Sequence, residues 1–128
     1  MKRAVLTTES APWPTAIDYD PAGKILHVTF DSGERFDLAA EYLRVESPSA
    51  EVQGHNPSEK QIVPGRSKVG IMNIEPVGNY AVRLTFDDLH DTGIYSWRYL
   101  HELGRDHAAR WERYVLELAK RGLKRDPR

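Results

Sequence analysis

The strongest constraint on how this chain folds is an alternation of apolar and polar residues at positions 80–86. A period of two residues places every second side chain on one face, which is typical of a β-strand packed against a core. A second alternating run leads into the turn sequence Asp31-Ser32-Gly33 and a returning arm, which predicts a hairpin. The expected strands are residues 16–19, 24–30, 35–38, 69–74 and 80–86.

Helical patterns lie between and after these strands. Residues 39–44 contain good helix formers and predict one or two helical turns. Ser96 can begin and Gly104 can end a helix over 96–103, and a longer helix is expected over 106–121. The predicted apolar stripe of the longer helix is Ala108, Trp111, Tyr114, Val115 and Leu118. These patterns predict an α+β fold, with a twisted, mainly antiparallel sheet and helices on or beside it.

The chain of 128 residues predicts a single domain, residues 1–128. Residues 46–68 form an irregular segment with three prolines, and segments of this length tend to carry function. Residues 105–128 hold eight basic and four acidic side chains. We expect this region to be a solvated helix face followed by a disordered tail.

Composition excludes several classes of protein. The 18 basic and 19 acidic residues nearly balance, which argues against a dedicated nucleic-acid partner. The chain has no cysteine, so a thiol nucleophile, a thiolate zinc site and a self-held iron–sulfur cluster are excluded. No apolar run is long enough to span a membrane, and the N-terminus turns polar too early for a signal peptide. A cytoplasmic location is therefore expected.

No assembled catalytic motif is present, so we expect no enzymatic activity. The sequence has no dinucleotide-binding or phosphate-binding glycine motif and no GxSxG nucleophile elbow. None of its five histidines is followed two residues later by an acid, as an iron oxygenase often requires. Arg66 and Lys68 could still meet an anion, although two solvated charges are the simpler interpretation.

The densest set of metal-ligating side chains lies at positions 87–91. Carboxylates with imidazole would suit iron, manganese or zinc. Alternatively, the acids cap a turn and the histidine bonds to the backbone. The candidate ligands are Asp87, Asp88 and His90, with His55 from the irregular segment.

Three long motifs resemble the gamma-butyrobetaine hydroxylase-like N-terminal domain family, a domain of unknown function. They are Leu43 to His55 (LRVESPSAEVQGH), Glu75 to Arg83 (EPVGNYAVR) and Phe86 to Trp97 (FDDLHDTGIYSW). The resemblance covers residues 13–104, and the helix and tail at 105–128 lie outside it. In two-domain hydroxylases, this domain precedes an oxygenase domain that the chain lacks, so the resemblance implies a stand-alone form without hydroxylase activity.

The resemblance also implies the place of a zinc site of three cysteines and one histidine. The cysteine positions fall at Ser47, Ser49 and Val52, and the histidine falls at His90. Since three of the four ligands are replaced, a repurposed zinc or iron site at His90 would need His55 and a carboxylate.

The family domain also occurs fused to ATPases that carry iron–sulfur clusters. The resemblance therefore implies a non-enzymatic accessory domain in metal or iron–sulfur protein maturation, with a cluster carrier or client as partner. The alternative is a metal-binding protein centred on His90. The expected contact surface is the irregular segment with Glu51, Arg66 and Tyr95. A sheet edge or the Trp111 and Tyr114 stripe could support a homodimer.

Overall fold

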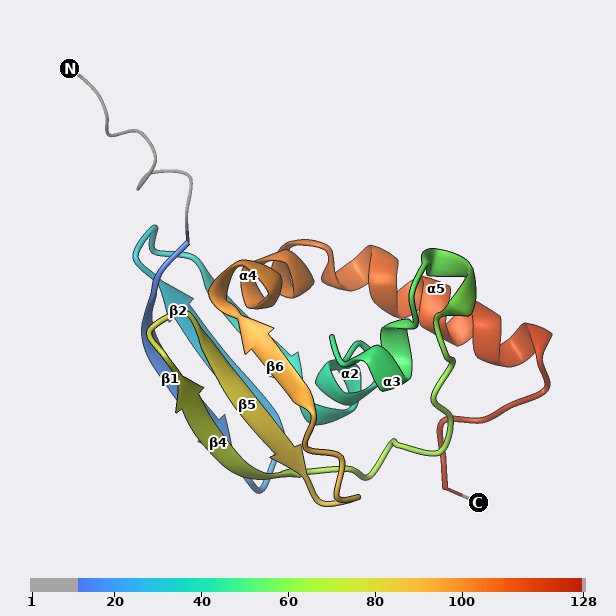
Figure 1. Cartoon of the computed structure of the whole chain (residues 1–128). Coiled ribbons are helices and arrows are strands. Elements are labelled where there is room, and N and C mark those ends of the chain that lie inside the picture. Colours follow the sequence, from blue (N-terminus) through green and yellow to red (C-terminus); the bar gives the residue numbers. More distant parts are fainter. Residues whose placement is uncertain (1–11, 128) are drawn as a thin grey trace.

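The computed structural model describes residues 12–127 and contains two antiparallel three-stranded sheets (Figure 1). The first sheet has the order β1-β2-β3 and the second the order β4-β5-β6, so within each sheet consecutive strands pair. The strands are β1 (Pro14–Asp20), β2 (Ile25–Phe30), β3 (Arg35–Ala39), β4 (Ile71–Val77), β5 (Ala81–Phe86) and β6 (Gly93–Ser96). The α+β prediction is confirmed, although the strands form two sheets.

The helices follow β3 and β6. They are α2 (Ala40–Val45), α3 (Ala50–Gln53), the 3₁₀ turn η1 (Pro57–Glu59), α4 (Trp97–Arg105) and α5 (His107–Lys120). The predicted cap at Ser96 is confirmed, because its hydroxyl accepts a hydrogen bond from the Tyr99 amide at 3.1 Å. The predicted end at Gly104 was wrong, because α4 continues through Gly104 to Arg105. Figure 1 shows α4 at one end of the sheets and α5 extending past them, beside α2 and α3.

One strand was missed by the sequence prediction. Residues 93–96 form β6, although the last strand expected from the sequence was 80–86 and Ser96 was expected to begin a helix. A four-residue strand is too short for a period of two to stand out. Its residues still alternate: Gly93 and Tyr95 are buried, and Ile94 is exposed.

The main core lies between the two sheets and the helices α2 and α4. Its apolar side chains come from alternating positions of β2 and β5, as the sequence predicts. Tyr42 on α2 joins this core to α4, because its hydroxyl donates to the Leu103 carbonyl at 2.7 Å. The strand residues are Leu26, Val28, Phe30, Val82, Leu84 and Phe86, each no more than 4% exposed.

A second, smaller cluster attaches α5 to the rest of the domain. Tyr114 and Leu118 are buried against Val45, with Ile62 and Trp111 packed around them. The predicted stripe was wrong at two positions, because Ala108 and Val115 are exposed. Tyr114 is buried in this cluster, and Trp111 is partly buried beside it.

The segment 46–68 and the C-terminal tail hold each other in place. The Gly65 and Ser67 amides donate to the carbonyls of Lys124 and Arg125 at 2.9 and 3.0 Å. The expectation of a disordered tail was therefore wrong as far as residue 127. The segment is also less irregular than expected, since α3 and η1 lie within it.

Along residues 12–127, no helix is both long and apolar enough to cross a membrane.

Candidate functional site

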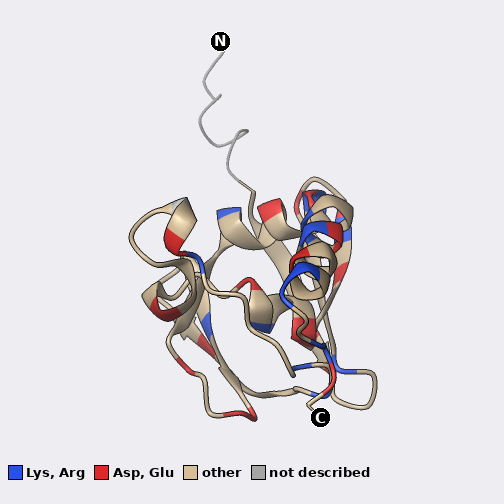
Figure 2. Ribbon diagram, turned by 90° about the vertical axis from the view of Figure 1, so that its right-hand side faces the viewer, with Lys and Arg blue, Asp and Glu red and all other residues tan. Residues whose placement is uncertain are grey.

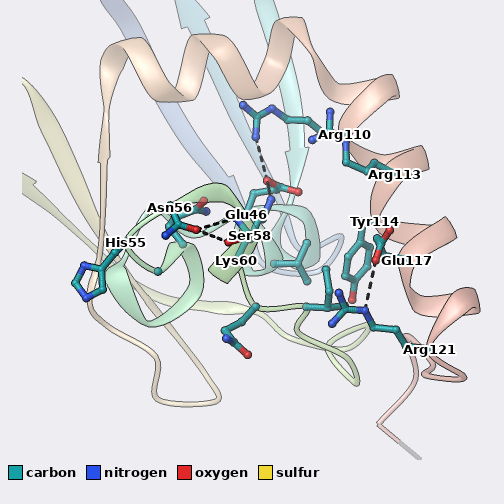
Figure 3. A pocket seen from close by; sticks show the side chains of 15 residues that line it. Glu46, His55, Asn56, Ser58, Lys60, Arg110, Arg113, Tyr114, Glu117 and Arg121 are labelled. Carbon is teal, nitrogen blue, oxygen red and sulfur yellow. Dashed lines mark hydrogen bonds and ion pairs between the residues drawn. The ribbon is translucent and has the colours of Figure 1, made fainter.

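A groove of about 750 Å³ runs between α5 and the segment 53–62. One wall is α5, the other is the loop that contains η1, and Val45 and Glu46 lie between them (Figure 3). The residues that carry the groove's charges are Glu46, Lys60, Arg110, Arg113, Glu117 and Arg121. A hollow of this size is in the range of ordinary ligand sites.

The basic residues on the α5 wall share one face of the helix. Arg110 and Arg113 are three residues apart, and Arg121 follows at a spacing that returns to the same face. In Figure 3, Arg110 and Arg113 both extend from α5 toward the opposite wall. Figure 2 shows the Lys and Arg residues of α5 and the tail on one side of the molecule, interspersed with acids.

A buried carboxylate fixes two of these cations. The Glu46 side chain is only 4% exposed, and its Oε1 accepts from Lys60 Nζ at 2.8 Å and Arg110 Nη1 at 3.0 Å. Arg110 also pairs with Glu102 at 2.8 Å. Charge-assisted bonds of this kind hold both side chains in place before any ligand arrives.

The remaining cations of the groove are less constrained. Arg121 makes one long contact with Glu117, at 3.4 Å, and its side chain is half exposed. The Arg113 side chain makes no ion pair or hydrogen bond with any residue of the range 12–127. The four cations and two carboxylates of the groove leave an excess of two positive charges.

A separate polar cluster surrounds His90. Its Nε2 lies 2.9 Å from Ser47 Oγ and 3.4 Å from Ser49 Oγ, and its Nδ1 lies 3.3 Å from Glu51 Oε1. Burial lowers the pKa of His90, and the nearby Arg44 guanidinium lowers it further, against the opposing charge of Glu51 and other acids. The neutral imidazole therefore links α3 to the turn between β5 and β6.

The groups around His90 have the order of a serine–histidine–acid triad. Unlike the serine of a catalytic triad, however, the serine here is inaccessible to a substrate. Ser47 is 0% exposed, so no substrate carbonyl can approach its hydroxyl. Gly93 closes the space, because a Cβ there would lie 2.7 Å from Ser47 Oγ. The cluster is therefore a packed structural element in this conformation.

The predicted metal ligands are not brought together. Asp88 Oδ2 accepts from Arg44 Nε at 2.8 Å and from Arg66 Nε at 2.7 Å, so this carboxylate is already neutralised. Asp87 accepts from the Gly70 amide at 3.0 Å. His55 lies in the groove, exposed, with its backbone amide bonded to Glu59. Across residues 12–127, no three His, Asp or Glu side chains are grouped to hold a metal.

The implied zinc site does not fit this chain. Ser47 and Ser49 do converge on His90, as the resemblance implied, and Val52 is buried beside them. Hydroxyls and an isopropyl group cannot replace three thiolates, which supply the charge that holds structural zinc. Hydrogen bonds from the serines take the place of metal bonds at His90.

The residues of the predicted contact surface differ in exposure. Tyr95 was wrong, because it is 0% exposed and its hydroxyl donates to the Leu43 carbonyl. Arg66 is half-buried against Asp88, whereas Glu51 is exposed. The sequence analysis missed Lys60, Arg110 and Arg113. The helical spacing of the arginines could have been recognised in the sequence. The contact of α5 with the opposite wall, about 50 residues earlier in the chain, could not.

Comparisons with known proteins agree with this fold. The model of the family "Gamma-butyrobetaine hydroxylase-like, N-terminal" matches residues 17–101. A comparison with curated proteins gave no match.

Several solved structures are similar. One protein solved by NMR is 44% identical, with a TM-score of 0.80, and the match covers 93% of this chain and 94% of that one. A second NMR structure is 40% identical, also with a TM-score of 0.80, over 99% and 92% of the two chains.

A crystal structure from Acidithiobacillus ferrooxidans, of a DUF971-family protein of unknown function, is 37% identical with a TM-score of 0.61. The match covers 71% of this chain and 91% of the chain in that crystal structure. The family match and these structures agree with the motifs around Ser47, Asn79 and His90. The chain belongs to the gamma-butyrobetaine hydroxylase-like N-terminal domain family.

Proposed function

We propose that this protein is a non-enzymatic interaction domain that binds a segment of a partner protein in the groove between α5 and residues 53–62. The observation that carries the proposal is the groove itself, about 750 Å³ in volume, with polar side chains on both walls. The irregular segment contributes one of those walls, which is the contact surface expected from the sequence.

The groove is suited to binding because its walls are already fixed. Tyr114 donates to the Val63 carbonyl at 2.6 Å, and burial raises its pKa to about 12, so the phenol stays protonated as a donor. Glu46 fixes Lys60 and Arg110. A preformed site loses little conformational entropy when a ligand binds.

A binding role is favoured over catalysis by the state of the ionisable groups. Catalytic sites usually combine an accessible nucleophile or base with a shifted pKa. The histidine with a lowered pKa, His90, lies outside the groove and is only 8% exposed. Within this proposal, an iron–sulfur cluster carrier or client is the partner class that the family resemblance favours.

The test uses a random peptide library displayed on phage and selected on the whole protein. A blocked variant, Ser58→Trp, fills the groove from an exposed lining position without changing charge. Ser32→Trp, in the hairpin turn, is the matched control.

We expect selected peptides to bind the wild type and Ser32→Trp equally and to lose at least about tenfold in affinity for Ser58→Trp. Amide chemical shifts should change along residues 53–62 and 110–121. Peptides that bind equally to all three proteins, or a selection that yields none, would contradict the proposal.

A metal site centred on His90 is the alternative proposal. The convergence of Ser47, Ser49 and Glu51 on the imidazole supports it, although only the histidine and the glutamate are common metal ligands. Elemental mass spectrometry of protein purified without chelator tests it. Near-stoichiometric metal that disappears in His90→Ala would support this alternative over a purely structural cluster.

A further inference from the structure

The charges of the groove indicate the chemistry of the partner. This inference rests on the proposed function. From the geometry, we infer that the groove binds an extended acidic segment of a protein, with two carboxylate side chains held by Arg113 and Arg121. Two of the groove's four cations are already neutralised by Glu46.

Arg113 is the primary anchor because no carboxylate among residues 12–127 forms an ion pair with its guanidinium group. Lys60 and Arg110 share the buried carboxylate of Glu46, and Arg110 has a second partner in Glu102. Arg113 has no such partner among residues 12–127. A ligand carboxylate could bond to it without first breaking an internal ion pair, and such planar guanidinium–carboxylate pairs are strong and directional.

Arg121 is the second anchor. Its contact with Glu117 is long, at 3.4 Å, and both side chains remain partly exposed, at 53% and 28%. Exposed pairs of this kind contribute little stability, so a ligand carboxylate can replace Glu117 at low cost. Glu117 then acts as an internal competitor that limits the groove to ligands with their own negative charge.

The spacing of the two anchors determines the form of the ligand. Arg121 caps the C-terminal end of α5, eight residues after Arg113, which is ~12 Å along a helix axis. An extended chain advances ~3.3 Å per residue, so its two acidic side chains would be about four positions apart. Two acidic side chains at that spacing would each meet one of the two guanidinium groups.

The experiment is an NMR titration of the whole protein with three seven-residue Gly/Ser peptides. They carry glutamate, glutamine or lysine at positions 2 and 6, and inorganic phosphate serves as a fourth probe. Two charge-reversal variants are compared: Arg113→Glu in the groove, and Arg98→Glu, exposed on α4 and outside the groove.

We expect only the glutamate peptide to shift amides along residues 53–62 and 110–121, with affinity that falls as salt rises. Arg113→Glu should weaken its binding at least about tenfold, and Arg98→Glu less than about twofold. Glu117→Gln should strengthen it. Equal shifts from phosphate at the same concentration would overturn the inference, because a simple anion site would suffice.

Failure of this inference can be told apart from failure of the proposed function. If the glutamine or lysine peptide binds the groove as well as the glutamate peptide, the acidic specificity is wrong and the interaction site stands. The same holds if all three fail while library-selected peptides bind there. If no peptide from either source perturbs the groove, both are wrong.

Discussion

At the scale of single residues, Leu89 adopts a conformation that its side chain disfavours. Its φ is 73°, in the left-handed region, and 75% of the residue is exposed. Leu89 lies in the turn after β5, where its amide donates to the Phe86 carbonyl at 2.8 Å. The exposed side chain has little packing to offset the strain.

Leu89→Gly should therefore stabilise the protein. Removing the Cβ relieves the left-handed strain, and the gain should be about 0.5–1 kcal/mol after the greater chain entropy of glycine is subtracted. Urea denaturation measures it. Leu89→Ala, which keeps the Cβ, is the control and should show no gain; equal effects of the two substitutions would rule out backbone strain.

His90 should make the stability of the protein depend on pH. Burial lowers its pKa in the folded state below the ordinary value of about 6.5. As pH falls below that value, the unfolded chain binds a proton that the folded protein does not, so the free energy of unfolding decreases. Above it, the stabilisation is fully present.

Denaturation between pH 7.5 and 5 measures this slope. His90→Gln should flatten it, whereas His55→Gln, at an exposed position, should leave it unchanged. An NMR titration that places the pKa of His90 at or above its ordinary value would contradict the account.

At the scale of elements, the contact between α4 and β3 depends on a glycine inside a helix. A Cβ on Gly104 would lie 2.3 Å from the Phe36 ring. Alanine is the better helix former by about 1 kcal/mol, but overpacking typically costs about 1–3 kcal/mol. The packing cost should dominate.

Gly104→Ala should thus destabilise the protein by about 1–2 kcal/mol. Thermal and urea unfolding measure the change. Adding Phe36→Leu removes the ring that meets the new methyl group, so the double variant should lose less than the sum of the two single variants. Additive losses would show that the close approach is not the cause.

The C-terminal tail is attached to α2 by one bidentate ion pair. Arg125 donates to both oxygens of Glu41, at 2.9 and 2.8 Å, and lies over the Trp111 ring at 5.1 Å. The Glu41 side chain is 8% exposed, so it depends on this partner, while Arg125 remains half exposed.

Arg125→Ala should cost about 1–2 kcal/mol, a charge-assisted contribution reduced by solvent screening. Lys120→Ala, which removes an exposed pair with Glu117, should change the stability by less than about 0.5 kcal/mol. Hydrogen exchange should also increase at the Gly65 and Ser67 amides in Arg125→Ala. Unchanged exchange there would mean that the tail is held by other contacts.

The sequence predicted elements better than it predicted their contacts. The alternation at 80–86 and the cap at Ser96 were sufficient because both are local patterns. The exposure of Ala108 and Val115 was not predictable, since the second cluster approaches α5 from Val45 and Ile62, far earlier in the chain. The burial of Tyr95 was not predicted because Tyr95 lies in β6, a strand too short to recognise in the sequence.

At the scale of the whole molecule, two polar networks connect the segment 46–68 to the rest of the domain. One centres on His90, which follows α3 in the chain, and the other on Glu46, which precedes it. The first holds the segment on the β5–β6 turn, and the second positions two of the groove's cations, Lys60 and Arg110. The candidate site is thus formed by tertiary contacts, which is why sequence motifs pointed to His90 and not to Arg113.

The most direct test of the binding groove is a paramagnetic NMR measurement with the glutamate peptide carrying a nitroxide at its end. The account predicts that amide signals along residues 53–62 and 110–121 broaden, and that Arg113→Glu removes the broadening. Broadening centred on the sheets, or broadening that persists in Arg113→Glu, would contradict it.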